Sequence, residues 1–165
     1  MGAFMNANRA AEPPRTSFFT RRSTLLVALL VVAAAAVAYL GISSVVADKL
    51  SRPKRLTLTY SPSDYGLPYQ TIQFASAVER IPLDGWYIDS RGTKVVLLLH
   101  GRDGIRDDPS LNLMGLTQTL VRSGYDVFTF DFRGHGLSGG ERYSFGDLER
   151  HDIDGALNYL KSRGG

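Results

Sequence analysis

Two stretches of this sequence combine residue types that can do acid–base or nucleophilic chemistry. The first is His100-Gly101-Arg102, and the second runs from Asp131 to Gly140 with the sequence DFRGHGLSGG. Serine, histidine and aspartate are the side chains of acyl transfer, in which a base activates a hydroxyl and an acid orients the base. Glycines at this density favour tight turns and close approach of the backbone to a ligand. These two stretches are therefore the candidates for a functional site.

The composition excludes other kinds of chemistry. The chain has no cysteine, which rules out disulfides, thiolate metal sites and a cysteine nucleophile. The three histidines, His100, His135 and His151, are not spaced as metal ligands on one helix, so we expect no metal and no other cofactor. The net charge is +3, but the basic residues gather at 9–22 and 49–55, on either side of an apolar run. This placement indicates membrane flanks, and we expect no nucleic-acid partner.

The elements that must position the two stretches follow from periodicity. Residues 95–99 form a continuous apolar run, which predicts a strand covered on both faces and hence a place in a parallel sheet. A helix is predicted next, from the spacing of Leu113, Leu116, Leu120 and Val121, with Gly124 just beyond its end. Residues 125–130 read as another strand. Strand, helix and strand in this order predict a right-handed crossover unit.

Further elements are predicted on both sides of this unit. Residues 69–75 and 81–89 indicate two strands joined by residues 76–80, and residues 55–60 alternate as a short strand or the end of a linker. Ser144 and Asp147 approximate a capping box for a last helix. Its apolar face is expected to comprise Ile153, Ala156, Leu157 and Leu160.

The N-terminal part predicts a membrane segment. Residues 1–24 form a polar, basic tail that we expect to be disordered, and residues 25–46 carry no charge over a length that spans a hydrocarbon core of about 30 Å. An uncleaved transmembrane anchor is the first interpretation. A signal peptide cleaved near Ala36-Val37-Ala38 is the second, and export by the twin-arginine route, from Arg21-Arg22, is the third.

The domain organisation follows from these boundaries. We expect a linker at 47–68 and a globular domain at 69–165. The arginines before the apolar run and the basic residues after it nearly balance. Because short N-terminal tails commonly stay in the cytoplasm, we expect the globular domain on the far side of the bilayer. The membrane bilayer itself is thus one expected partner.

The sequence resembles the N-terminal half of an α/β-hydrolase of the serine aminopeptidase or lysophospholipase-like branch. The resemblance is carried by LLLHG at 97–101, by SGYDVFTFDFRGHGLSGG at 123–140 and by DLERHD at 147–152. The segment LDGWYI at 83–88 is similar to a strand that opens many hydrolases of this group. The resemblance implies an α/β fold whose sheet is mostly parallel, with helices on both faces.

The resemblance also implies roles for individual residues. It makes the backbone N–H of Arg102 an oxyanion-hole donor, supported by His100 and Gly101. It places a loop at the rim of the active site, in which Asp131 and Arg133 form an ion pair or bind backbone. Asp131 and His135 are not a catalytic pair, because the acid and base of this family follow the nucleophile in the chain. The rim residues are Asp131, Arg133, Gly134, His135, Gly136 and Ser138.

The nucleophile that the family requires is missing. No G-x-S-x-G occurs in the 165 residues, and Ser138 and Ser144 are not preceded by a strand that turns sharply into a helix. We therefore expect an inactive N-terminal fragment of a membrane-anchored serine hydrolase that acts on an ester, lipid or peptide bond. In such a fragment the strand at 95–99 becomes an open sheet edge.

Two alternatives remain. The chain can be a non-catalytic, membrane-anchored half-domain that binds a partner. Gly134-x-Gly136-x-x-Gly139 also fits a dinucleotide-binding fingerprint, but residues 141–143 separate it from the next helix, so we do not expect nucleotide binding.

Overall fold

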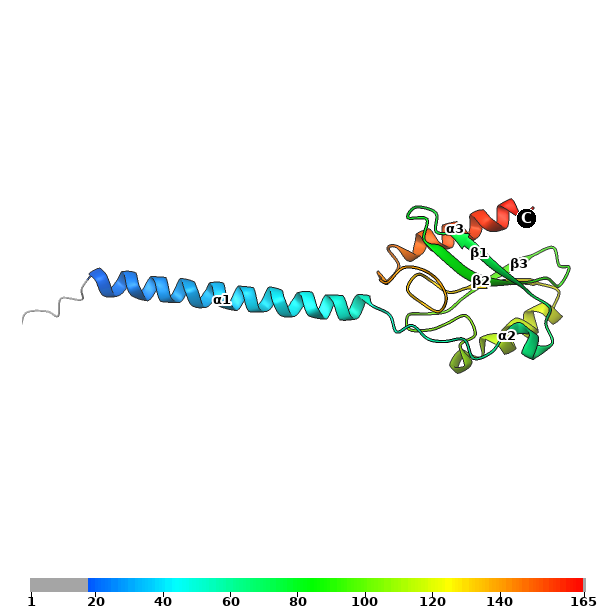
Figure 1. Cartoon of the computed structure of the whole chain (residues 1–165), viewed down its shortest axis with the longest axis horizontal. Helices are drawn as coiled ribbons and strands as arrows, with labels where there is room; N and C mark the ends of the chain where they lie inside the picture. The colour runs from blue at the N-terminus through cyan, green and yellow to red at the C-terminus, as the bar shows by residue number, and fades with distance from the viewer. Residues whose placement is uncertain (1–17, 165) are drawn as a thin grey trace, which may run out of the picture. The chain divides into compact units, whose positions relative to one another are not determined.

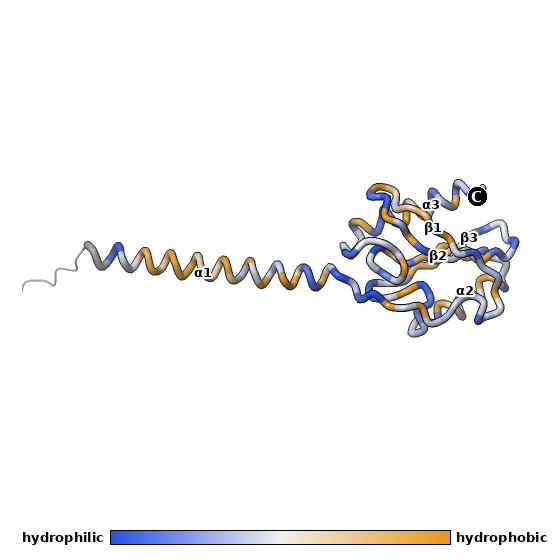
Figure 2. The backbone as a smooth tube through the Cα atoms, viewed as in Figure 1, coloured by the Kyte–Doolittle hydropathy of each residue, from blue (hydrophilic) through white to orange (hydrophobic). Residues whose placement is uncertain are grey.

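The computed structural model describes residues 18–164, which fall into two units, Met1–Val46 and Ala47–Gly165. Most of the expected 1–24 tail lies outside the described residues. Helix α1 (Phe18–Ser51) contains the expected 25–46 segment, and orange is the dominant colour along the middle of this helix in Figure 2, with blue near its ends. Its stretch Arg21–Ser51 has 31 residues and a mean hydropathy of 2.7. By length and composition α1 is able to cross a membrane, and a signal sequence has the same properties.

The second unit is built on a four-stranded sheet of order β1-β2-β4-β3. Its strands are β1 (Gln70–Ala75), β2 (Pro82–Ile88), β3 (Val95–Leu99) and β4 (Asp126–Phe130), close to the predicted ranges. The expectation of a mostly parallel sheet is wrong for this part of the fold, since only β3 and β4 pair in parallel. A short connection such as 76–81 can join only antiparallel neighbours, whereas parallel pairing needs a crossover, and β3 and β4 are joined by one.

Helices cover both faces of the sheet, as expected. Helix α2 (Leu113–Arg122) and helix α3 (Glu149–Ser162) lie on opposite sides of it in Figure 1. Alternation along β2 explains this, because Leu83 and Tyr87 belong to the apolar cluster under α3 while Trp86 and Ile88 belong to the cluster with α2. Strands β2, β3 and β4 thus contribute to both apolar clusters, whereas β1 contributes to the one under α3.

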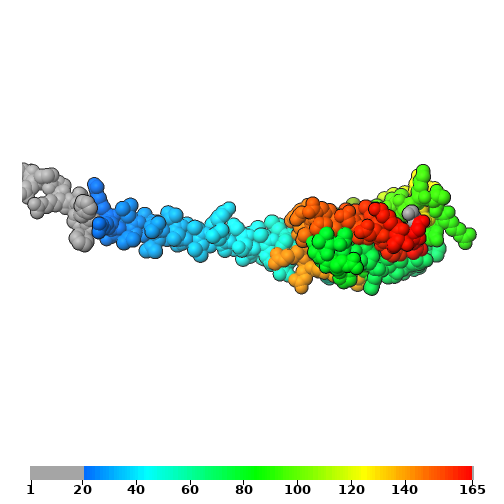
Figure 3. Space-filling view, turned by 90° about the horizontal axis from the view of Figure 1, so that it is seen from above, coloured from blue at the N-terminus to red at the C-terminus, as the bar shows by residue number. Residues whose placement is uncertain are grey.

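Helix α3 packs closely on the sheet. Gly155 permits this, because a Cβ there would lie 2.4 Å from the carbonyl oxygen of Ala75. The red segment of α3 accordingly lies beside the green segment of β1 and its turn in Figure 3. The expected apolar face is only partly right, since Ala156 is buried but Leu157 is exposed.

The start of α3 differs from the prediction. The helix begins at Glu149, and the residue that closes the preceding turn is Glu149 instead of Asp147. The Glu149 carboxylate accepts from the backbone N–H of Ser144 at 3.0 Å, and the Ser144 hydroxyl accepts from Leu148 N–H at 2.6 Å. The turn is therefore longer than a capping box allows.

Residues 47–68, expected as a linker, cluster with the second unit. Residues 55–60 form no strand, and a 3₁₀ turn, η1 (Pro62–Tyr65), follows them. Leu67 is buried in the apolar cluster beneath α2.

Candidate active site

The loop that follows β3, residues 101–108, is called here the donor loop. His100, at its start, is buried, and its Nδ1 lies 2.7 Å from the carbonyl oxygen of Gly101. A carbonyl oxygen can only accept, so Nδ1 carries a proton. Nε2 accepts a hydrogen bond from the backbone N–H of Phe132 at 3.2 Å. Both ring nitrogens are therefore satisfied by a neutral imidazole.

The Gly101 carbonyl sets the direction of the Arg102 amide. This oxygen also accepts from Gly104 N–H at 3.1 Å, so two donors hold it. In a planar trans peptide the C=O and N–H bonds point in opposite directions. Arg102 N–H therefore points away from His100. It donates no hydrogen bond within residues 18–164, and Gly101 and Arg102 are exposed. This arrangement leaves one backbone donor available to a ligand at the carboxyl end of β3.

The side chain of Arg102 contacts Phe145 and Asp103. Its guanidinium lies 5.1 Å from the ring centroid of Phe145, and its Nε lies 3.6 Å from Asp103 Oδ2. The predicted role of Arg102 uses its main chain, and these contacts leave that role unaffected.

Burial keeps His100 uncharged. Removal from water lowers its pKa below the ordinary value of 6.5, and this outweighs the hydrogen bond to Gly101 and the nearby Asp131, which favour protonation. Protonation would also place an N–H at Nε2, facing the N–H of Phe132. The neutral tautomer is thus the one that fits the geometry.

The loop that follows β4, residues 131–140, is called here the rim loop. Asp131 is fully buried and accepts from Arg106 N–H at 2.9 Å and from Leu137 N–H at 3.3 Å. Its nearest cation is Arg106, whose Nε lies 3.7 Å away. Asp131 therefore binds backbone, one of the two expected outcomes, and does not pair with Arg133.

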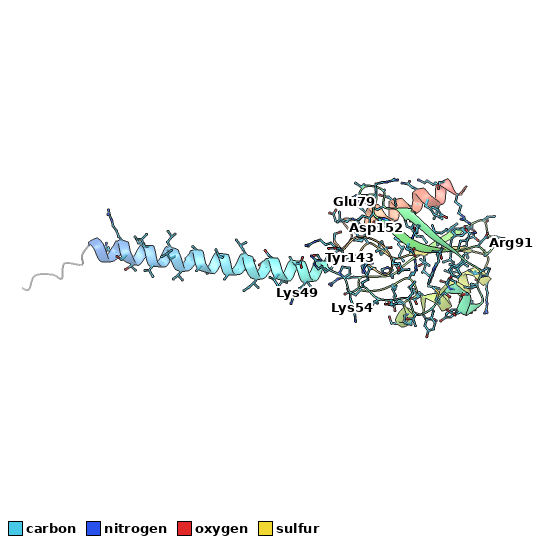
Figure 4. All side chains as sticks on the ribbon, in the orientation of Figure 1. Lys49, Lys54, Glu79, Arg91, Tyr143 and Asp152 are labelled. Atoms are coloured by element: carbon cyan, nitrogen blue, oxygen red, sulfur yellow. The ribbon has the colours of Figure 1, made fainter. Side chains whose placement is uncertain are left out.

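Arg133 forms a buried ion pair with a residue of α3. Its guanidinium lies 2.7 Å from Asp152 and 3.0 Å from Glu79, and it also donates to the Ser76 hydroxyl at 3.0 Å. Figure 4 shows Glu79 and Asp152 near each other at one end of the domain. The hydrogen bond from Arg133 is the main reason why the pKa of Glu79 falls to about 2.

Ser138 is occupied as a structural hydroxyl. It is buried, donates to the carbonyl oxygen of Asp131 at 2.5 Å, and accepts from Asp84 N–H at 3.0 Å. Both of its usual hydrogen-bonding roles are filled, so it offers no free nucleophile. The prediction that Ser138 shapes the rim instead of attacking a substrate fits this environment.

His135 joins the rim loop to the donor loop. Its Nδ1 lies 2.9 Å from the carbonyl oxygen of Arg133, and its Nε2 accepts from Asp103 N–H at 3.2 Å. Its ring centroid lies 5.0 Å from that of His100. His135 thus anchors the peptide next to Arg102.

The glycines of the rim loop permit its tight course. Gly134 and Gly136 have φ of 74° and 44°, and a Cβ on Gly136 would lie 2.0 Å from Asp131 Oδ2. Gly139 is followed by a turn region, and the next helix begins only at Glu149. No helix N-terminus therefore starts among these glycines, although the dinucleotide fingerprint requires one there.

A pocket of about 400 Å³ adjoins the rim loop at Leu137. Arg106 lines it, with its guanidinium carbon 4.3 Å from the ring centroid of Trp86 and Nη1 2.5 Å from Asp84 Oδ1. These residues were not predicted as part of a site. Asp152 lies in the DLERHD segment that carries part of the resemblance, whereas no sequence pattern marked Arg106 or Glu79.

Comparison with known proteins agrees with this geometry. Residues 90–164 match the family model described as serine aminopeptidase S33. The resemblance to the serine aminopeptidase branch of the α/β-hydrolases is confirmed over this region. A comparison with curated proteins gave no match.

Solved structures of one esterase, Pf2001 from Pyrococcus furiosus, are similar to about two thirds of this chain. Its C222₁ crystal form is 31% identical with a TM-score of 0.62, covering 68% of this chain and 41% of the esterase. Its P2₁ form is also 31% identical with a TM-score of 0.64, covering 68% of this chain and 43% of the esterase. The chain therefore spans about two fifths of the esterase that it resembles.

Proposed function

We propose that this chain supplies the oxyanion-binding side of a serine hydrolase that acts on an ester, lipid or peptide bond. The observation that carries the proposal is the Arg102 amide, which belongs to an exposed residue, donates no hydrogen bond within the described residues, and is oriented by the doubly held Gly101 carbonyl. The resemblance to an esterase favours an ester among the three substrate classes.

In the proposed reaction a serine attacks the substrate carbonyl carbon and negative charge develops on the carbonyl oxygen. A backbone donor that is already oriented stabilises this charge without reorganisation, and removal of one such donor costs about 10² to 10³ in rate. Arg102 N–H is the donor from this chain. The proposed acyl transfer uses no metal or organic cofactor.

The nucleophile is not among these residues. The 165 residues contain no G-x-S-x-G, and the hydroxyl of Ser138 is engaged on both sides. We therefore propose that the chain is the N-terminal part of a longer hydrolase and has no hydrolytic activity by itself. We further propose that α1 anchors this hydrolase in a membrane, with the second unit outside the cytoplasm.

Covalent labelling with a fluorophosphonate tests the proposal. The 165-residue chain in detergent should stay unlabelled, and the same chain extended by the coding sequence beyond Gly165 should be labelled at one serine. Labelling of the short chain that disappears in Ser138→Ala or Ser144→Ala would contradict the predicted inactivity. An extended chain that folds but takes up no label would favour the non-catalytic binding protein instead.

A further inference from the structure

Residues 53–60, called here the strap, contact both loops of the candidate site. The strap precedes the family match at 90–164. Lys54 N–H donates to Asp103 Oδ1 at 2.9 Å, beside Arg102. Further along, the N–H groups of Thr59 and Tyr60 donate to Asp107 Oδ2 at 2.5 and 2.6 Å. The strap is thus fixed to the donor loop at two separate points.

One strap residue, Arg55, is fixed to the rim loop. Its Nη1 donates to the carbonyl oxygens of Gly136 at 2.7 Å and Ser138 at 2.6 Å, with a longer contact of 3.4 Å to His135. Its Nη2 donates to the carbonyl oxygen of Gly140 at 2.9 Å. A guanidinium has five N–H donors in a planar fork and no acceptor, so it matches a ring of carbonyl oxygens.

The course of the rim loop creates this ring of oxygens. Gly136 and Gly140 adopt left-handed φ values of 44° and 80°, which turn the chain so that its carbonyls converge on the Arg55 guanidinium. Converging carbonyl dipoles repel one another, and a cation between them reverses that repulsion. Arg55 therefore stabilises a loop conformation that would otherwise be unfavourable.

The effect of Arg55 extends to the oxyanion donor through His135. This histidine belongs to the rim loop, and its Nε2 accepts from Asp103 N–H, next to Arg102. If the rim loop became mobile, His135 would move with it. The hydrogen bond from Asp103 N–H to His135 Nε2, which holds the donor loop, would then be lost.

We propose that Arg55 is a positioning residue of the active site, and that the strap ties the donor loop and the rim loop into one unit. The inference rests on the proposed function, since it assigns a role relative to the Arg102 amide. It adds to that function a residue, in the segment directly after the apolar helix, that holds the two loops in position.

Amide hydrogen exchange of Arg55→Ala, followed by NMR on the full 165-residue chain in detergent micelles, tests the proposal. The informative amides are Gly134 and Ser138 in the rim loop and Asp103 in the donor loop, and those of Tyr87 and Phe128 in the core strands serve as references. We expect exchange of the informative amides to rise about tenfold or more, with the references unchanged. Guanidinium chloride at about 10 mM, far below denaturing concentrations, should restore protection by refilling the carbonyl ring. Arg122→Ala, which removes an exposed arginine of α2, is the matched control and should change none of these rates.

Four results would overturn the proposal. The loop amides of Arg55→Ala could exchange as in the unaltered chain. They could rise by the same factor as the core strands, which would indicate a general loss of stability. Sodium chloride could restore protection in Arg55→Ala as well as guanidinium chloride does. Finally, Arg55→Ala could lose protection in the rim loop while the Asp103 amide of the donor loop stays protected. The exchange measurement needs no catalysis, so its failure is distinct from a failure of the proposed function, which fluorophosphonate labelling reports.

Discussion

The donor loop and the rim loop leave neighbouring parallel strands at the same edge of the sheet, yet they use their polar groups differently. In the rim loop, Asp131, Arg133, His135 and Ser138 are buried and bound to partners within the domain. In the donor loop, Arg102 is exposed and its N–H has no acceptor among residues 18–164.

This difference separates structural from chemical roles. A polar group that is fully satisfied inside the protein stabilises a conformation but has nothing left to offer a substrate. An oriented donor that has no partner within the protein is the type of group that stabilises charge in a transition state. The residue types that first suggested chemistry, the Asp, His and Ser of the rim loop, prove to be scaffolding, while the candidate chemical group is a main-chain amide.

The largest expected effect concerns the buried ion pair of the rim loop. Asp152→Ala leaves the Arg133 guanidinium buried without its closest partner, and we expect the free energy of unfolding to fall by about 3–5 kcal/mol. Denaturant unfolding in detergent measures this. Asp147→Ala removes the partner of Arg150 from an exposed pair at 3.4 Å and should cost less than about 1 kcal/mol. Equal losses in the two variants would show that the rim loop is not held by this buried pair.

A smaller loss is expected at a rim-loop glycine. Gly136→Ala places a methyl group against the Asp131 carboxylate and imposes a left-handed conformation on alanine, so we expect a loss of about 3 kcal/mol. Gly66→Ala is the control, because Gly66 has φ of 70° with open space around it, and it should cost only about 1–2 kcal/mol. Comparison of thermal unfolding midpoints distinguishes the two. An unfolding midpoint for Gly136→Ala no lower than that for Gly66→Ala would mean that the rim loop is not tightly packed around Gly136.

A pH dependence is expected from His100 at the donor loop. The pKa of His100 is lowered in the folded protein, so as the pH falls below 6.5 the unfolded chain binds a proton first and stability is lost. The loss can reach about 1.4 kcal/mol per pH unit and ends where the folded His100 becomes protonated. His100→Asn keeps a donor toward Gly101 and removes the titration. The free energy of unfolding, measured from about pH 5 to about pH 7.5 on both sides of the ordinary pKa of 6.5, should therefore become independent of pH in the variant.

Glu79 provides an internal check on this assignment. Its pKa is lowered from 4.5 to about 2, chiefly by Arg133, so its contribution is complete above 4.5 and is lost as the pH falls toward 2. This second decline should persist in His100→Asn. If the decline near pH 6 also persists, then a group other than His100 causes it.

The smallest effect is expected for the Arg102 side chain. Arg102→Ala keeps the backbone N–H and removes only exposed contacts with Asp103 and Phe145, so the free energy of unfolding should change by less than about 0.5 kcal/mol. The same denaturant measurement applies. A loss above about 1 kcal/mol would show that the side chain, and not only the peptide of Arg102, holds the donor loop.

The sequence predicted the elements that depend on local patterns. Strand β3 and helix α2 were predicted because a continuous apolar run and helical spacing are visible within single segments, and Gly124, with φ of 83°, ends α2 as expected. The number of parallel strands was overestimated. The resemblance implied a mostly parallel sheet, but β1 and β2 are joined by a short connection and therefore pair antiparallel.

The contacts that organise the site were harder to predict because they join distant residues. Arg133 pairs with Asp152 on α3, and Arg55 binds carbonyls that lie 80 to 85 positions further along the chain. A charged residue in a connecting segment carries no signal of such a partner. The role of Arg102 was predictable only through the resemblance, since a backbone N–H has no residue type of its own.

The exchange rate of the Arg102 amide tests the central claim most directly. Measured by NMR on the full chain, Arg102 N–H should exchange near the rate of an unstructured peptide, whereas Gly104 N–H, bound to Gly101, and Asp103 N–H, bound to His135, should be protected. That result would establish a free donor in an ordered loop. An Arg102 amide as protected as those two neighbours would contradict the account, because its N–H would already be bound within the protein and unable to stabilise an oxyanion.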